Sequence, residues 1–201
     1  MLLVCVSLSV GAQIVGKLDC SGIGTPIDGE SEKSLNELWY SCAERNASLV
    51  ESLKVDPHAD KLLEMAHADA ELHRASTPVP ISKFDIESCL LHPRFMVEQR
   101  RPDGSLKLRP IDHFSWSKCG KEDSVNGHVV PTEKLKHDTL DRLEALLRLF
   151  VHETGEVPAL IKADIDTAFR RIPVAPGQRW VCGSVFRAHE QVGRVIRSYV
   201  I

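Results

Sequence analysis

The sequence has no Cys-x-x-Cys pair, and its six cysteines are widely scattered along the 201 residues. Zinc modules need paired ligands at short spacing, and disulfide-rich secreted domains concentrate their cysteines in a short chain. The spacing therefore supports neither kind of site and favours reduced thiols in an intracellular protein, cytoplasmic or nuclear. Histidine adds no metal signal, because His67 and His73 are six residues apart and do not share one helical face.

The chain also lacks a hydrophobic run long enough to span a bilayer. The apolar segment Met1–Gly16 falls short of the roughly 20 residues that a membrane helix needs, so we expect no membrane partner. It has a small residue at Ala12 but no basic region before it, and cleavage there would leave five cysteines. We interpret it as a buried strand or the start of a truncated reading frame. The alternative is a small secreted protein, for which a glycan on Asn46 would be a marker.

The charges are divided unevenly along the chain. Residues 94–201 contain 18 Lys and Arg against 14 Asp and Glu, a net charge of +4, whereas residues 1–93 have a net charge of −7. An excess of basic residues is typical of surfaces that contact phosphates, although an excess of four also suits an ordinary solvated surface. Any contact with nucleic acid is therefore expected in the C-terminal half.

The N-terminal half is predicted to be helical. Apolar residues keep helical spacing from Ser34 to about Lys54 and again from His58 to Ala75, with Pro57 between them. A Pro-containing linker follows at 76–80, and Ser82–Leu91 is compatible with one short helix. We divide the chain into an apolar segment and loop (1–30), a helical region (31–93) and a C-terminal region (94–201).

The C-terminal region combines strands with one long helix. Pro131-Thr132-Glu133 predicts a helix start with Thr132 as the N-cap, and a leucine stripe ends at Gly155. We expect this helix to pack on a sheet. Trp116–Val130 is predicted to be a loop, and two strands are expected within the apolar stretches 180–187 and 195–201.

Two further segments carry the functional signal. Phe95–Gln99 and Leu106–Ile111 are strand-like, and Pro102-Asp103-Gly104 between them is typical turn chemistry, so the sequence predicts a β-hairpin. Val157–Asp164 is short and apolar and ends in an acid, which predicts a buried strand that delivers Asp164 to solvent, a cationic partner or a metal.

The stretch from Lys162 to Val174, K-A-D-I-D-T-A-F-R-R-I-P-V, resembles motif A of reverse transcriptases. The resemblance implies that Asp164 is the catalytic, metal-binding aspartate and that the backbone carbonyl of Ile165 binds the same Mg²⁺. The family's chemistry is two-metal phosphoryl transfer. Phe169 matches the aromatic steric gate that favours deoxynucleotides over ribonucleotides.

The predicted hairpin ends in K-L-R-P-I-D-H-F-S, which is similar to the end of the fingers hairpin of reverse transcriptases. The resemblance implies that Lys107 and Arg109 bind the incoming deoxynucleoside triphosphate, for which a guanidinium is well suited. His113 stands where the pattern has a second acid, so the role of Asp112 stays open. Primer-template nucleic acid is the implied partner.

The resemblance covers about residues 94–187, and the Y-x-D-D motif that completes the metal site of reverse transcriptases is absent from the sequence. We therefore expect the front part of a retrotransposon RNA-directed DNA polymerase, inactive on its own. The alternative is a non-catalytic nucleic-acid-binding or interaction remnant. The expected fold is α+β, a partial right-hand polymerase fingers and palm with a mainly antiparallel sheet, preceded by the helical region.

Overall fold

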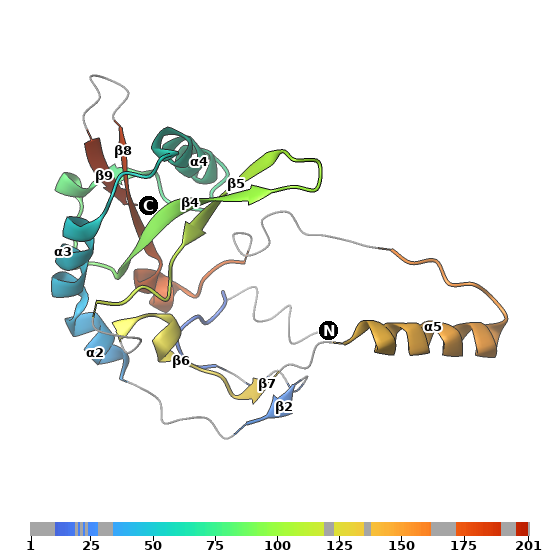
Figure 1. Ribbon diagram of the computed structural model, residues 1–201. Coiled ribbons are helices and arrows are strands. Elements are labelled where there is room, and N and C mark those ends of the chain that lie inside the picture. Colours follow the sequence, from blue (N-terminus) through green and yellow to red (C-terminus); the bar gives the residue numbers. More distant parts are fainter. Residues whose placement is uncertain are drawn as a thin grey trace.

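The computed structural model describes residues 11–18, 20, 22, 24–27, 34–118, 123–134, 138–161, 172–189 and 196–200. Helices and strands are mixed in this part of the chain, and its strands form one five-stranded sheet and two small two-stranded sheets (Figure 1). This architecture is compatible with the expected α+β class.

The larger sheet is mainly antiparallel, as predicted. Its strands, in spatial order, are β3 (Val79–Pro80), β9 (Ile196–Val200), β8 (Gly183–His189), β4 (Leu91–Arg100) and β5 (Leu106–Asp112). Neighbouring strands are antiparallel except β4 and β8, which run parallel. The small sheets pair β1 (Gly16–Lys17) with β6 (Val129–Val130) and β2 (Thr25–Pro26) with β7 (Glu133–Lys134).

The predicted N-terminal helices are confirmed, with one break. The first is divided at Ser41 into α2 (Leu35–Tyr40) and α3 (Cys42–Ser52), and the second is α4 (Ala59–Glu71). In α4, Leu62 and Ala66 are one turn apart and fully buried, which places the apolar stripe of this helix on the sheet.

The core joins the helices to the sheet through three apolar clusters. The first packs α4 on β4 and β8 and contains Ala59, Leu62, Leu63, Ala66, Met96, Phe186 and Ala188. The second and third join α2 and α3 to the start of β4 and to the segment from 181 to 185. Residues on both sides of the proposed boundary at 93 thus share these clusters, while the division into 1–30, 31–93 and 94–201 stays a prediction.

The hairpin prediction is confirmed. Strands β4 and β5 pair in register from Arg94 opposite Asp112 to Arg100 opposite Leu106. Gly104 in the turn has a φ of +82°, a conformation that glycine adopts without a steric penalty. The Asp103 carboxylate accepts hydrogen bonds from the backbone N–H and the hydroxyl of Ser105, which closes the turn.

The expected helix over Ser82–Leu91 is wrong. Only a short 3₁₀ turn, η1 (Ile81–Lys83), forms there, and Leu91 already belongs to β4. The physical reason lies in α3, where the buried Asn46 side chain binds the carbonyls of Ile86 and Cys89 and the N–H of Leu91. These backbone groups are therefore held by a side chain instead of by helical hydrogen bonds.

The long C-terminal helix begins later than predicted. Helix α5 spans Leu140–Thr154, and Thr139 is its N-cap, with its hydroxyl accepting from the N–H of Arg142. Gly155 ends the helix in the left-handed conformation, as expected. The predicted start at Thr132 is wrong because the next two residues form β7, which pairs with β2.

The expected packing of α5 on a sheet and the expected buried strand after it are also wrong. The apolar side chains of α5 are largely exposed, Leu140 by 83%, and Figure 1 shows the helix extending away from the larger sheet. Val157 and Ile161 are 88% and 91% exposed, and residues 157–161 form no strand because no described strand pairs with them. Asp164, the last residue of the expected strand, lies outside the described residues.

The remaining strand expectations are largely confirmed. Strand β8 begins at Gly183, because residues 176–181 form a 3₁₀ helix, η4 (Pro176–Val181). Strand β9 matches the second apolar stretch. The expected loop over Trp116–Val130 contains the short η3 (Asn126–His128) and β6 among its described residues.

Candidate functional site

The structure describes two of the five predicted site residues. Lys107 and Arg109 both lie on β5, whereas Asp164, Ile165 and Phe169 lie outside the described residues. The geometry of the site is therefore that of the β4–β5 hairpin.

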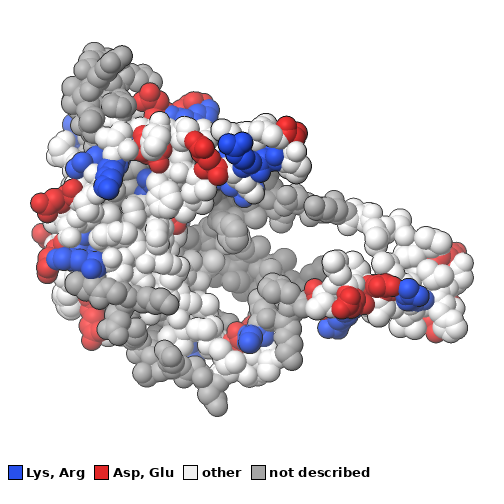
Figure 2. All heavy atoms as spheres, viewed as in Figure 1, with Lys and Arg blue, Asp and Glu red and all other residues white. Residues whose placement is uncertain are grey.

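Lys107 and Arg109 project from the same face of the hairpin. They are two residues apart on one strand, and their cross-strand partners are Gln99 and Val97. We call this side the outer face and define it by Phe95, Val97, Gln99, Lys107, Arg109, Ile111 and His113. Both cations are exposed, and Figure 2 shows Lys and Arg side chains gathered over the hairpin.

The outer face contains no acidic residue. The acids of the hairpin lie elsewhere: Glu98 binds the His58 ring at 2.8 Å, Asp103 closes the turn, and Asp112 lies on the opposite side. His113 extends the outer face, with its ring 6.1 Å from that of Phe95. An acid at this position, as in the reverse transcriptase pattern, would place a negative charge beside the two cations.

The inner face of the hairpin holds it on the core. Met96 and Leu108 pack into the apolar cluster beneath α4. Beside them, the buried Arg94 guanidinium donates to the Asp69 carboxylate of α4 at 3.1 Å and lies 3.6 Å from the Asp112 carboxylate. Asp112 in turn accepts a hydrogen bond of 2.7 Å from the hydroxyl of Ser184 on β8. The inner face is thus fixed to two other elements.

The loop before α4 adds a second attachment. One oxygen of the Asp56 carboxylate accepts from the N–H of Met96 at 2.8 Å, and the other accepts from the N–H of His58 at 2.7 Å. Together with the contact between His58 and Glu98, this joins the start of α4 to the middle of β4.

The root of the hairpin is held by two buried polar residues of α3. The Arg45 guanidinium donates to the carbonyls of Leu91, Trp116 and Asp123 and lies 4.7 Å from the centre of the Trp116 ring. Burial lowers the pKa of Arg45 to about 10, so it stays a cation at neutral pH. The neighbouring Asn46 binds the backbone between 86 and 91.

Sequence reasoning missed the roles of Arg45, Asn46 and Arg94. The signal for the first two lay in the helical pattern, because residues 45 and 46 fall between Cys42 and Leu49 on the apolar stripe of α3. Polar side chains on such a stripe must find hydrogen-bond partners. For Arg94 no comparable signal exists, because its partner Asp69 belongs to another element.

The burial of Asn46 also bears on the secreted alternative. Its side chain is fully buried, and its amide makes three hydrogen bonds to the backbone. A glycan on this side chain is incompatible with the folded structure, because it would need the amide nitrogen that donates to the carbonyls of Ile86 and Cys89.

The described cysteines and acids form no metal centre. Cys20, Cys42, Cys89 and Cys182 are free thiols, and burial raises the pKa of Cys42, Cys89 and Cys182 to about 11, 12 and 11. These three thiols are therefore protonated at neutral pH and are poor metal ligands. Among the described residues, no group of three or more His, Cys, Asp and Glu is arranged to hold a metal ion.

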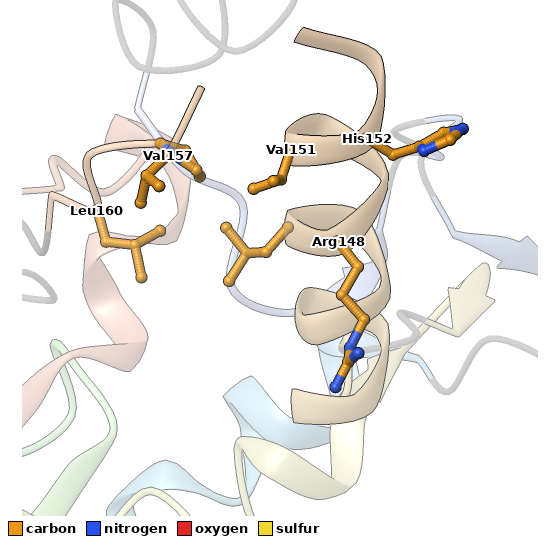
Figure 3. Close-up of a pocket in the computed structure, with 7 residues that line it drawn as sticks. Arg148, Val151, His152, Val157 and Leu160 are labelled. Carbon is orange, nitrogen blue, oxygen red and sulfur yellow. The ribbon is translucent and has the colours of Figure 1, made fainter. Parts of the chain in front are cut away.

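A pocket lies away from the hairpin, between α5 and the segment that follows it (Figure 3). Its lining is mostly apolar, and Val151, Val157 and Leu160 face one another while His152 points away. It contains none of the predicted site residues, and it brings no acid or nucleophile together with the two basic residues in its lining.

Comparison with protein-family models, with curated proteins and with solved structures found no match for this chain. Among the described residues, no helix is long and apolar enough to cross a membrane. The functional assignment therefore depends on the sequence resemblance and on the geometry of the hairpin.

Proposed function

We propose that this chain is the fingers and early palm of a reverse transcriptase-like nucleotidyltransferase of retroelement origin, and that its hairpin contacts phosphates through Lys107 and Arg109. The observation that carries the proposal is the outer face, where both cations lie exposed on one side of an anchored hairpin without an acid among its residues. Primer-template nucleic acid and deoxynucleoside triphosphates are the proposed ligands.

The chemistry of the two cations suits this role. A guanidinium binds two phosphate oxygens at once, and an ammonium acts as a mobile point charge. Apolar side chains on the same face, Val97 and Ile111, offer contact area for sugars or bases. The core contacts of the inner face, with α4 and β8, keep the hairpin in place, so little ordering is needed when a ligand binds.

The catalytic part of the proposal concerns residues outside the described structure. By resemblance, Asp164 and the carbonyl of Ile165 would hold Mg²⁺, which stabilises charge on the transferring phosphoryl group, and Phe169 would exclude ribonucleotides. Since one carboxylate and one carbonyl hold Mg²⁺ weakly and the sequence contains no Y-x-D-D, we expect no incorporation of deoxynucleotides by this chain alone. Binding is the activity to measure.

The test is the binding of an RNA template annealed to a DNA primer, measured by fluorescence anisotropy. Lys107→Ala combined with Arg109→Ala should lower the affinity about tenfold, because two exposed charge contacts contribute roughly 0.7 kcal/mol each. The matched control is Lys54→Ala combined with Lys83→Ala, which removes the same charge from exposed residues outside the hairpin. Equal losses in both double variants, or no binding by the unmodified chain, would contradict the proposal.

The non-catalytic remnant is separated from the polymerase fragment by a second measurement. Both are expected to bind nucleic acid. Only a polymerase fragment is expected to bind deoxynucleoside triphosphates in preference to ribonucleotides, because Phe169 would act as its steric gate. Titration with both nucleotides in the presence of Mg²⁺, with Phe169→Ala as the comparison, distinguishes the two. An equal response to both nucleotides that Phe169→Ala does not change favours the remnant.

A further inference from the structure

We propose that Asp112 is a positioning residue that sets the orientation of β5 and so aims Lys107 and Arg109 at the ligand. This inference rests on the proposed function for the identity of the ligand. The position itself follows from the hairpin: Asp112 is the last residue of β5 and lies directly opposite Arg94 of β4.

Side chains along β5 alternate between the two faces of the hairpin. Lys107 and Arg109 lie on the outer face, and Asp112 is on the inner face because it is three residues beyond Arg109. A side chain that is fixed on the inner face therefore fixes which way the odd-numbered residues of the strand project. A rotation of β5 about its axis would turn the two cations away from their common direction.

Two contacts hold the Asp112 side chain on the inner face. Its carboxylate lies 3.6 Å from the Arg94 guanidinium and accepts the Ser184 hydroxyl at 2.7 Å. The Arg94 side chain is only 1% exposed and also binds Asp69 of α4 at 3.1 Å. One buried cation thus joins β5 to α4, and one hydroxyl joins β5 to β8.

In the pair formed by Arg94 and Asp112, the Arg94 side chain is buried and the Asp112 side chain is 21% exposed. Removing one partner leaves the other charge buried and poorly compensated, so the remaining group moves or draws in water. If Asp112 loses its charge, Arg94 keeps Asp69 and is drawn toward α4, which releases the end of β5. The contacts of Met96 and Leu108 would keep the hairpin on the core while the end of β5 becomes less ordered.

Asp112→Asn is therefore expected to change the binding of nucleic acid with an unusual sign. The substitution removes a negative charge close to a cationic face, so Coulomb attraction alone would strengthen the binding of a polyanion. The positioning role requires the opposite result, a loss of affinity for primer-template of about fivefold. This loss lies within the range of interaction energies measured for residues in contact, as Asp112 and Arg94 are.

The matched control is Glu98→Gln, which makes the same change of charge on the same hairpin. Glu98 is half-exposed, and its ion pair is with His58. A glutamine at this position can still accept a hydrogen bond from the His58 ring. We expect Glu98→Gln to bind primer-template as tightly as the unmodified chain or slightly more tightly.

The experiment combines primer-template binding with hydrogen exchange of the β5 amides, both measured on protein shown to be folded by circular dichroism. The expected result is weaker binding and faster exchange in β5 for Asp112→Asn, and neither change for Glu98→Gln. Binding at or above the level of the unmodified chain, or unchanged exchange in β5, would overturn the inference.

Two other outcomes are also decisive. If Asp112→Asn does not fold, Ser184→Ala, which removes only the hydroxyl, should show the same two changes to a smaller degree, and their absence would overturn the inference. If the unmodified chain binds no nucleic acid, the proposed function fails, while exchange in β5 still decides whether Asp112 positions the strand.

Discussion

Replacement of Asn46 by alanine is the sharpest test of how the helical region organises the hairpin. Asn46 lies on α3 and is fully buried. Its amide donates to the carbonyls of Ile86 and Cys89 at 2.6 and 2.7 Å, and its carbonyl accepts from the N–H of Leu91 at 2.9 Å. The substitution removes all three hydrogen bonds at the point where β4 begins.

The magnitude follows from the three backbone groups that lose a partner. A buried donor or acceptor left unsatisfied costs roughly 1–3 kcal/mol. We use the lower end of this range because the emptied space is polar and can admit water. Alanine also has a higher helix propensity than asparagine, which returns about 0.5 kcal/mol. The expected net loss in the free energy of unfolding is about 2.5 kcal/mol.

The assay is equilibrium unfolding in urea followed by tryptophan fluorescence. The matched control is Asn36→Ala on α2, where the side chain is exposed, and we expect it to change stability by less than about 0.5 kcal/mol. Asn46→Asp should be at least as damaging as alanine, because a carboxylate cannot donate to the two carbonyls. A loss below about 1 kcal/mol for Asn46→Ala would show that these three hydrogen bonds do not hold the start of β4.

Two further predictions concern the buried side chains. Burial, with the nearby Arg45 cation, lowers the pKa of His92 to about 3, so below a pH of about 6.5 the unfolded chain binds a proton that the folded chain does not, and stability falls as the pH decreases. Between pH 6.5 and 5 the free energy of unfolding should fall by roughly 1.5 kcal/mol for this reason. His92→Gln should abolish this loss, whereas the control His67→Gln, at an exposed residue, should not. Equal pH profiles of stability for the two variants would contradict the lowered pKa of His92. Leu62→Ala in α4 should cost about 2–5 kcal/mol, whereas Leu140→Ala in α5 should cost less than about 0.5 kcal/mol in the same urea assay, and a large effect at Leu140 would show that α5 is packed.

The hairpin could be predicted from the sequence because its determinants are local. Two strand-like stretches flank a turn whose Asp103 and Gly104 have the required chemistry, and the pairing joins residues that are close in the chain. The common direction of Lys107 and Arg109 also follows from their spacing. These parts of the candidate site need no knowledge of the rest of the fold.

The errors arose where distant segments decide the structure. Glu133 looks like the first turn of a helix, but it pairs with β2, more than one hundred residues earlier in the sequence. The segment before β4 has a helix-compatible composition, but Asn46 occupies its backbone groups from another helix. Val157–Ile161 has the apolar composition of a buried strand but no described strand beside it.

The contacts made by the inner face of the hairpin could not be predicted from the sequence either. Arg94, Asp69 and Ser184 come from three elements, and nothing in their spacing indicates that they meet around Asp112. Their contacts depend on the order of strands in the sheet and on the position of α4. The role of Asp112, which the sequence left open, can be argued only from this arrangement.

If Lys107 and Arg109 contact phosphates, as proposed, the salt dependence of primer-template binding must change when they are removed. Each phosphate contact adds about 0.9 to the slope of the logarithm of the binding constant against the logarithm of the salt concentration. We expect Lys107→Ala combined with Arg109→Ala to lower the magnitude of this slope by about 1.8 relative to the unmodified chain. An unchanged slope would contradict the proposed contacts, since the two side chains would then release no counterions on binding.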